Sequence, residues 1–104
     1  EALATFTQLT QDYPELPEPY NNMAVILAAQ NQFDKARVAL EMAVRTNPGY
    51  ATAHENLGDI YARLAAQSYG KAISLDGANA SAPVKLKAVN ALLTPPPKGK
   101  KAAR

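Results

Sequence analysis

The sequence contains no cysteine, which excludes disulfides and thiolate metal sites and leaves the redox compartment open. Its single histidine, His54, has no second imidazole with which to share a metal. No apolar run approaches the ~20 residues of a membrane span, and no signal peptide is visible. Because the chain starts at Glu1 in the middle of a helical pattern, we expect an upstream segment to have been removed. The cellular location therefore stays open.

Charge is scarce and unevenly placed. The net charge of +2 arises in the last seven residues, where three Lys and one Arg contribute +4. Residues 1–97 hold seven Lys/Arg against nine Asp/Glu, a net of −2. The basic tail has no aromatic side chain on which a base could stack. We therefore interpret the tail as a solubilising terminus, and we expect no nucleic-acid partner and no membrane span.

Two amphipathic runs occupy residues 17–50, PEPYNNMAVILAAQNQFDKARVALEMAVRTNPGY. Their apolar residues recur three or four positions apart, which is typical of one face of an α-helix. The large residues of this stripe are Tyr20, Met23, Leu27, Phe33 and Leu40. Asn31-Gln32 separates the runs and Asn47-Pro48-Gly49 ends the second, so the stretch predicts an antiparallel helical hairpin. The small residues Ala24, Ala36 and Ala43 would let the two backbones approach closely.

The pattern repeats with a period of 34 residues, as the pair Pro14 and Pro48 shows. Other positions at this offset keep their size class or differ by one step: Ala2/Ala36, Phe6/Leu40, Leu9/Ala43, Tyr20/His54, Met23/Leu57, Ala24/Gly58 and Leu27/Tyr61. This helix–turn–helix period, with YxxMAxxL at Tyr20 and HxxLGxxY at His54, resembles the tetratricopeptide repeat over residues 1 to about 80. The resemblance implies an all-α solenoid of stacked helix pairs.

On this reading residues 1–93 form one tetratricopeptide-like helical domain. Its parts are a half repeat at 1–14, a full repeat at 17–50, a shortened repeat at 51–79 and a capping helix at 81–93. We expect Phe6 and Leu9 of the half repeat to bury against the next helix. The remaining residues, 94–104, are rich in Pro and Lys and are predicted to be disordered.

The shortened repeat lacks five residues where the full repeat has its turn. Tyr69, Ala72 and Gly77 follow Leu40, Ala43 and Pro48 at an offset of 29 instead of 34. No Pro, Asn or Asp interrupts the stretch between Ile60 and Leu75, and Gly70 is its one weak point. The pattern therefore favours a single helix over 52–75, about 36 Å long at 1.5 Å per residue. A tight turn at 64–67 is the alternative, and the sequence does not choose between the two.

The start of this long helix carries two further signals. Thr52 and Glu55 match a capping box, which predicts a helix start at Thr52 or close to it. His54-Glu55 begins an HExxH zinc motif, but Gly58 stands where the second His is required. We therefore expect His54 to pack at a helix–helix contact. We predict no metal site, no cofactor and no catalytic residues, and hence a protein that is not an enzyme.

The resemblance implies that partners bind on the concave side, which the first helix of each pair lines. The exposed polar and small residues of these helices are the predicted partner-binding residues: Glu18, Asn21, Asn22, Val25, Thr52, Glu55, Asn56, Asp59 and Arg63. Asn side chains offer donors and acceptors to the backbone of an extended peptide, and Glu55 and Asp59 would favour a Lys or Arg on it. We thus predict a module that binds a peptide or protein segment. Self-association as a homodimer, through the helix 52–75 and the C-terminal helix, is the alternative.

Overall fold

The computed structural model describes residues 1–93, and the predicted disordered tail at 94–104 lies outside the described residues. All regular structure in the described part is helical, as the all-α prediction requires. The helices are α1 (Ala2–Asp12), α2 (Pro17–Ala29), α3 (Phe33–Thr46), α4 (Ala51–Leu75) and α5 (Ser81–Leu93). The described residues form two compact units, which divide after Leu64. Helix α4 is continuous and contributes to both.

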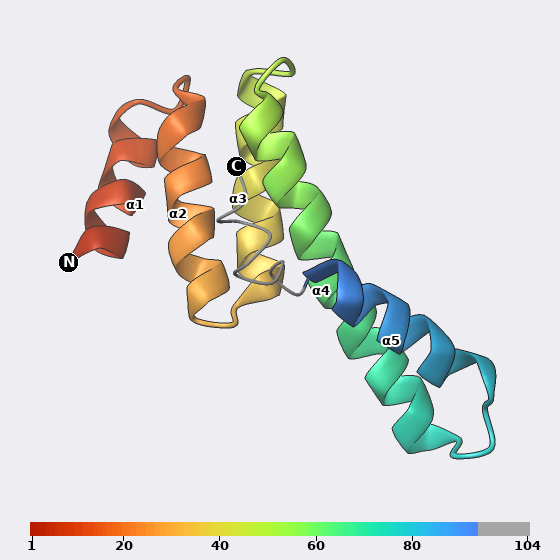
Figure 1. Cartoon of the computed structure of the whole chain (residues 1–104). Coiled ribbons are helices and arrows are strands. Elements are labelled where there is room, and N and C mark those ends of the chain that lie inside the picture. Colours follow the sequence, from red (N-terminus) through yellow and green to blue (C-terminus); the bar gives the residue numbers. More distant parts are fainter. Residues whose placement is uncertain (94–104) are drawn as a thin grey trace, which may run out of the picture. The chain divides into compact units, whose positions relative to one another are not determined.

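In the first unit, α1, α2 and α3 lie side by side in alternating directions (Figure 1). Helix α2 starts at Pro17, where the missing N–H of proline costs nothing. The turn to α3 passes through Asn31, whose φ of 61° is a left-handed conformation that asparagine tolerates. The hairpin predicted over residues 17–50 is confirmed, and its polar break is the turn.

The core of the first unit follows the predicted stripe. Its most deeply buried members are small: Ala36, Ala43 and Ala53 have no exposed surface. Tyr20 and Leu40 are buried around them, at 8% and 1% exposure. Small side chains allow close approach of the helices, and the large ones fill the remaining space.

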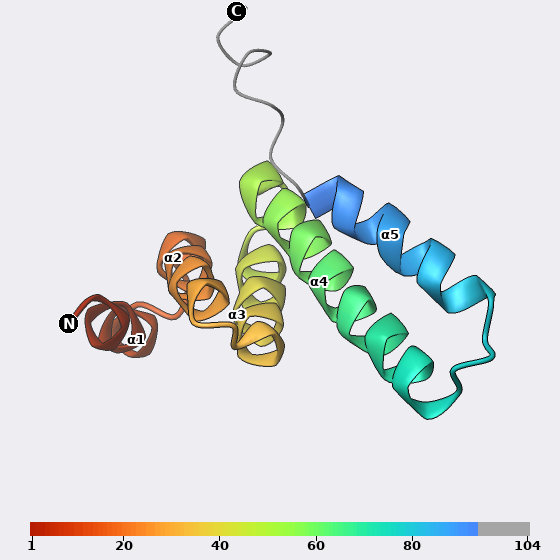
Figure 2. The ribbon, with the colours of Figure 1, turned by 60° about the horizontal axis from the view of Figure 1, so that its bottom comes forward.

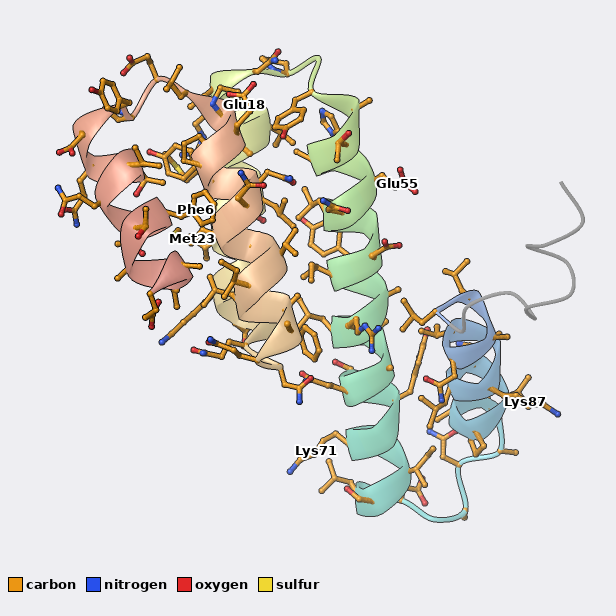
Figure 3. The ribbon with its side chains drawn as sticks, turned by 60° about the vertical axis from the view of Figure 1, so that its left-hand side comes forward. Phe6, Glu18, Met23, Glu55, Lys71 and Lys87 are labelled. Atoms are coloured by element: carbon orange, nitrogen blue, oxygen red, sulfur yellow. The ribbon has the colours of Figure 1, made fainter. Side chains whose placement is uncertain are left out.

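Helix α1 packs on α2 less completely. Phe6 and Leu9, which the sequence predicted to be buried, are each only half-buried. Figure 3 shows Phe6 pointing from α1 toward α2. Thr10 is the buried residue of α1, and its hydroxyl donates to the carbonyl of Thr7 at 2.7 Å, so its polar group is satisfied.

The prediction that His54 packs at a helix–helix contact is wrong. Its side chain is exposed, and Nε2 lies 2.8 Å from the Pro48 carbonyl oxygen. His54 directly follows the buried Ala53, and successive residues of a helix are rotated by roughly 100° about its axis. Its side chain therefore points to a different side of α4. His54 therefore ties the turn at 47–50 to the first turn of α4 instead of filling the core.

The capping box at Thr52 is not formed as predicted. Helix α4 begins at Ala51, so Thr52 lies within the first turn and not at the N-cap. The first turn is closed instead by the His54 N–H, which donates to the Tyr50 carbonyl at 3.2 Å. The prediction that the helix starts close to Thr52 is nevertheless correct to within one residue.

The choice left open at residues 64–67 is settled in favour of one helix. Helix α4 runs through 25 residues without a break. Gly70 lies inside it with open space around the position of a Cβ, so it marks no close contact. The large apolar side chains of this helix are not buried throughout, because Tyr61 is 48% exposed and Leu75 is 74% exposed.

In the second unit, α5 lies beside the second half of α4, as Figures 1 and 2 both show. Asn79 caps α5, since its Oδ1 accepts the N–H groups of Ser81 and Ala82 at 3.0 Å each. Ala82 is the one buried residue of α5. Tyr69 and Ile73 of α4 are half-buried. The second half of α4 thus has a neighbour within its own chain, although a thinly packed one.

Enlarging the side chain of Ala36 should test the close contact of α2 and α3. We expect Ala36→Leu to destabilise the protein by about 1–3 kcal/mol, because added methyl groups in a filled core force the helices apart. Ala29→Leu makes the same change at an exposed position of α2 and should change stability by less than about 0.5 kcal/mol. Urea unfolding followed by circular dichroism measures both, and equal effects would contradict the contact.

A proline at Gln67 should test the continuity of α4. Gln67 is exposed, so Gln67→Pro removes a helical hydrogen bond without disturbing side-chain packing, and we expect a loss of about 3 kcal/mol or more together with reduced helicity. Gln67→Ala is the matched control and should be close to neutral. If the proline variant kept the helicity and stability of the parent, the chain would have to break near residues 64–67.

Candidate functional site

A groove between α2 and α4 lies within the first unit, and several of the predicted partner-binding residues line it. It encloses about 190 Å³. We call it the α2–α4 groove; its lining residues are Ala24, Val25, Ala28, Leu40, Asn56, Asp59, Ile60 and Arg63. Small and aliphatic side chains form its floor, and the polar groups at its rim all come from α4.

One hydrogen bond holds the rim of the groove to its wall. The Asn56 amide donates to the Asn21 side-chain oxygen at 3.0 Å, across 35 positions of sequence. Asn21 is only 5% exposed, so this bond satisfies a polar group that has little access to water. Asn21 therefore serves to position Asn56, whereas the sequence had placed both on the binding surface as equals.

A second contact positions the cation of the rim. The Arg63 guanidinium carbon lies 5.8 Å from the centre of the Phe33 ring, within the range of a cation–π interaction. Asp59 lies one turn before Arg63 on α4, so the rim carries one charge of each sign. The sequence had assigned Phe33 to packing alone, and it offered no signal for the contact with Arg63.

The other predicted residues lie outside the groove. Glu18, Asn22, Thr52 and Glu55 are exposed and do not line it. Figure 3 shows Glu18 near the start of α2 and Glu55 projecting from α4 away from α2. The structure therefore gathers Val25, Asn56, Asp59 and Arg63 of the predicted set and leaves these four on the surrounding surface.

A larger hollow, which sequence reasoning missed, lies between α1 and α3 over α2. It encloses about 540 Å³, and its walls are almost wholly apolar. We call it the α1–α3 hollow; its main lining residues are Leu3, Met23, Leu27, Val38, Ala39 and Met42. Both methionines of the chain line it. Their thioether side chains adapt readily to different shapes. The occurrence of both methionines in the predicted hairpin was a signal that the sequence offered.

The junction of α3 and α4 carries the one described salt bridge, between Arg37 and Glu41 at 3.2 Å. The Tyr61 hydroxyl donates to the same carboxylate at 3.1 Å. This hydrogen bond raises the pKa of Tyr61 above its usual value, because the carboxylate stabilises the protonated phenol. The salt bridge lies within α3, whereas the Tyr61 hydrogen bond joins α4 to α3, and both lie on an open surface.

Neither a metal cluster nor a membrane-crossing helix occurs in the described residues. No three His, Asp or Glu side chains gather there in a way that could hold a metal ion. None of the helices within residues 1–93 is both long and apolar enough to cross a bilayer. The groups that line the α2–α4 groove are apolar side chains, one amide and one charge of each sign.

Removing the Asn56 amide should show that the rim is held by its bond to Asn21. We expect Asn56→Ala to destabilise the protein by about 1–3 kcal/mol, because the buried Asn21 oxygen loses its donor. Asn22→Ala removes the same group from an exposed neighbour and should be close to neutral. Thermal unfolding compares the two variants, and a neutral Asn56→Ala would show that the bond contributes nothing to the groove.

Parts of this sequence are similar to known proteins. Residues 25–64, which run from α2 into α4, match a family model described as the TPR (tetratricopeptide) repeat. The chloroplastic tetratricopeptide repeat domain-containing protein PYG7 of Arabidopsis thaliana is 42% identical over 50 residues, 48% of this chain and 17% of that protein. The TPR repeat-containing thioredoxin TTL4 of the same plant is 39% identical over 64 residues, 62% of this chain and 9% of that protein.

The chain thus spans less than a fifth of the length of either relative. In this chain the residues that match the repeat model run from α2 through α3 into α4. On these grounds residues 25–64 of the chain are similar to the tetratricopeptide repeat, which both relatives carry in their names.

Proposed function

We propose that this chain is a non-enzymatic module that binds an extended segment of a protein partner in the α2–α4 groove. Tetratricopeptide repeats are generally protein–protein interaction modules, and this supports the class of function. The observation that carries the proposal is the composition of the groove, in which an apolar floor is bordered by a fixed amide and by charges of both signs. Such a surface can hold a side chain and its backbone together.

The size of the groove limits what enters it. At about 190 Å³ it is smaller than the ~300–1,000 Å³ of typical small-molecule sites. We propose that one aliphatic side chain of the partner rests on Ala24, Ala28 and Ile60, while Asn56 bonds to the adjoining backbone. An amide suits this role because it donates and accepts at once.

Charge adds a preference to this fit. Asp59 is exposed and has no described cationic partner, whereas Arg63 is held over Phe33. A Lys or Arg in the partner would therefore find its counter-charge at Asp59. With Glu18 and Glu55 exposed on the same two helices, the field around the groove favours basic segments over acidic ones.

A charge placed in the floor of the groove should abolish binding. Peptides are first selected from a random library on the full chain, and their affinities are then measured by titration calorimetry. We expect Val25→Asp to weaken the selected peptides at least tenfold, because the introduced carboxylate must be desolvated. Val38→Asp is the matched control, since Val25 and Val38 are 53% and 52% exposed on neighbouring helices and line different hollows.

Two further results bear on this experiment. Asp59→Lys should reverse the preference of the selected peptides from basic to acidic residues, with helicity unchanged. Peptides that bind Val25→Asp and the parent equally well, but lose affinity for Val38→Asp, would move the binding site to the α1–α3 hollow and refute the proposal.

Self-association is a second proposal, favoured by the exposed apolar residues of the second unit. Leu75 of α4 is 74% exposed, and Val84 and Leu92 of α5 are 69% and 73% exposed. The second half of α4 is not left uncovered, because α5 lies beside it (Figure 2). The exposed apolar residues of α5 are the surface through which two copies would associate.

A further inference from the structure

Two opposite charges at the rim of the α2–α4 groove are not paired with each other. Asp59 and Arg63 stand four positions apart on α4, a spacing and an order that suit an ion pair within a helix. Among residues 1–93, however, the one salt bridge joins Arg37 to Glu41. Asp59 and Arg63 are both exposed. The groove therefore presents two open charges of opposite sign.

The contact with Phe33 explains why this pair is not made. The guanidinium carbon of Arg63 lies 5.8 Å from the centre of the Phe33 ring. A ring engages the flat face of a guanidinium and leaves the N–H donors at its edge available to a carboxylate. Phe33 begins α3 and is not part of the groove lining. It therefore holds Arg63 apart from Asp59 without neutralising its charge.

The two sides of the groove differ in chemistry. The α2 side consists of Ala24, Val25 and Ala28, whereas both charges of the lining stand on α4. In an extended chain successive side chains point to opposite sides. A segment lying along the groove can therefore direct one side chain to the apolar α2 side and the residues before and after it to α4.

The spacing of the charges fits the same arrangement. Asp59 and Arg63 are separated by about 6 Å along the axis of α4, at 1.5 Å per residue. Side chains two positions apart in an extended chain lie on one side of it, about 6.6 Å from each other. Adjacent residues point to opposite sides, so two adjacent charges do not match this pair.

We propose that the partner segment carries a basic and an acidic residue two positions apart, with an aliphatic residue between them. The basic residue meets Asp59, the acidic residue meets Arg63, and the aliphatic residue contacts the α2 side. Either order of the charges fits, because an extended chain can lie along α4 in two directions. The inference rests on the function proposed for the groove and specifies its partner. Phe33 is a positioning residue, because it acts through Arg63.

Peptide spacing gives the first test. Among peptides selected from a random library on the full chain, we expect opposite charges two positions apart to be enriched over adjacent ones. A selected peptide is then remade with its aliphatic residue moved outside the pair, so that the charges become adjacent while the composition stays the same. Titration calorimetry should show roughly two- to fivefold weaker binding, because one ion pair is lost.

Double-mutant cycles then assign each charge to its counterpart. Arg63→Gln and neutralisation of the peptide's acidic residue should each weaken binding roughly two- to fivefold, and their combination should cost no more than either alone. Asp59→Asn and neutralisation of the basic residue should behave in the same way. Arg63→Gln combined with neutralisation of the basic residue is the internal control, and these two losses should add.

Replacing Phe33 tests its positioning role. Phe33→Leu removes the ring and lets Arg63 pair with Asp59, so we expect binding to weaken roughly two- to fivefold. Adding Arg63→Gln to Phe33→Leu should restore part of this loss, because Asp59 is then open again to the basic residue. A further loss in the double variant would contradict the role assigned to Phe33, since a purely structural defect would not be relieved by removing the cation.

The outcomes separate this inference from the function on which it rests. Peptides that lose affinity for Val25→Asp but show no preferred spacing of charges, or whose cycles are additive throughout, would overturn the inference and leave peptide binding in the groove intact. Peptides that bind Val25→Asp as well as the parent, or a library that yields no binder, would refute the proposed function and this inference with it.

Discussion

The close approach of α2 and α3 is the contact on which the rest of the first unit depends. Ala36 and Ala43 have no exposed surface, and Leu27 and Leu40 are nearly as well buried. Because the alanines occupy little space, the backbones come near enough for the large side chains to interlock. Ala53 brings α4 into the same core. The walls of both the α2–α4 groove and the α1–α3 hollow are outer surfaces of this packed cluster.

The second determining feature is the length of α4. A repeat of ordinary length would turn back after Leu64, but this sequence offers no residue that ends a helix there. The helix therefore continues to Leu75, and the residues after Leu64 form a second compact unit with α5. A unit built from one helix pair buries little, as Ala82 shows by being the one buried residue of α5. Exposed apolar surface follows directly from the missing turn.

Polar contacts give different roles to residues that the repeat pattern places on the same concave surface. The concave residues predicted from the repeat divide into two groups, because the Asn21–Asn56 bond turns one amide inward and presents the other at the rim. Arg63 is drawn toward Phe33, which leaves Asp59 as the open charge. The charges at the rim of the groove are therefore set by these particular side chains and their contacts.

The sequence by itself determined the helical class, the 34-residue period, the α2–α3 hairpin and the buried positions of its stripe. These features depend on spacings within a few turns, which local physics fixes. It placed His54 in the core, which was wrong because a family slot does not specify the rotation of a helix about its axis. It also placed a capping box at Thr52, which was wrong because α4 begins one residue earlier. Tertiary structure alone decided that rotation, the gathering of Val25, Asn56, Asp59 and Arg63, and the existence of the α1–α3 hollow. Each of these depends on distances between side chains far apart in the chain, which packing sets and no local pattern encodes.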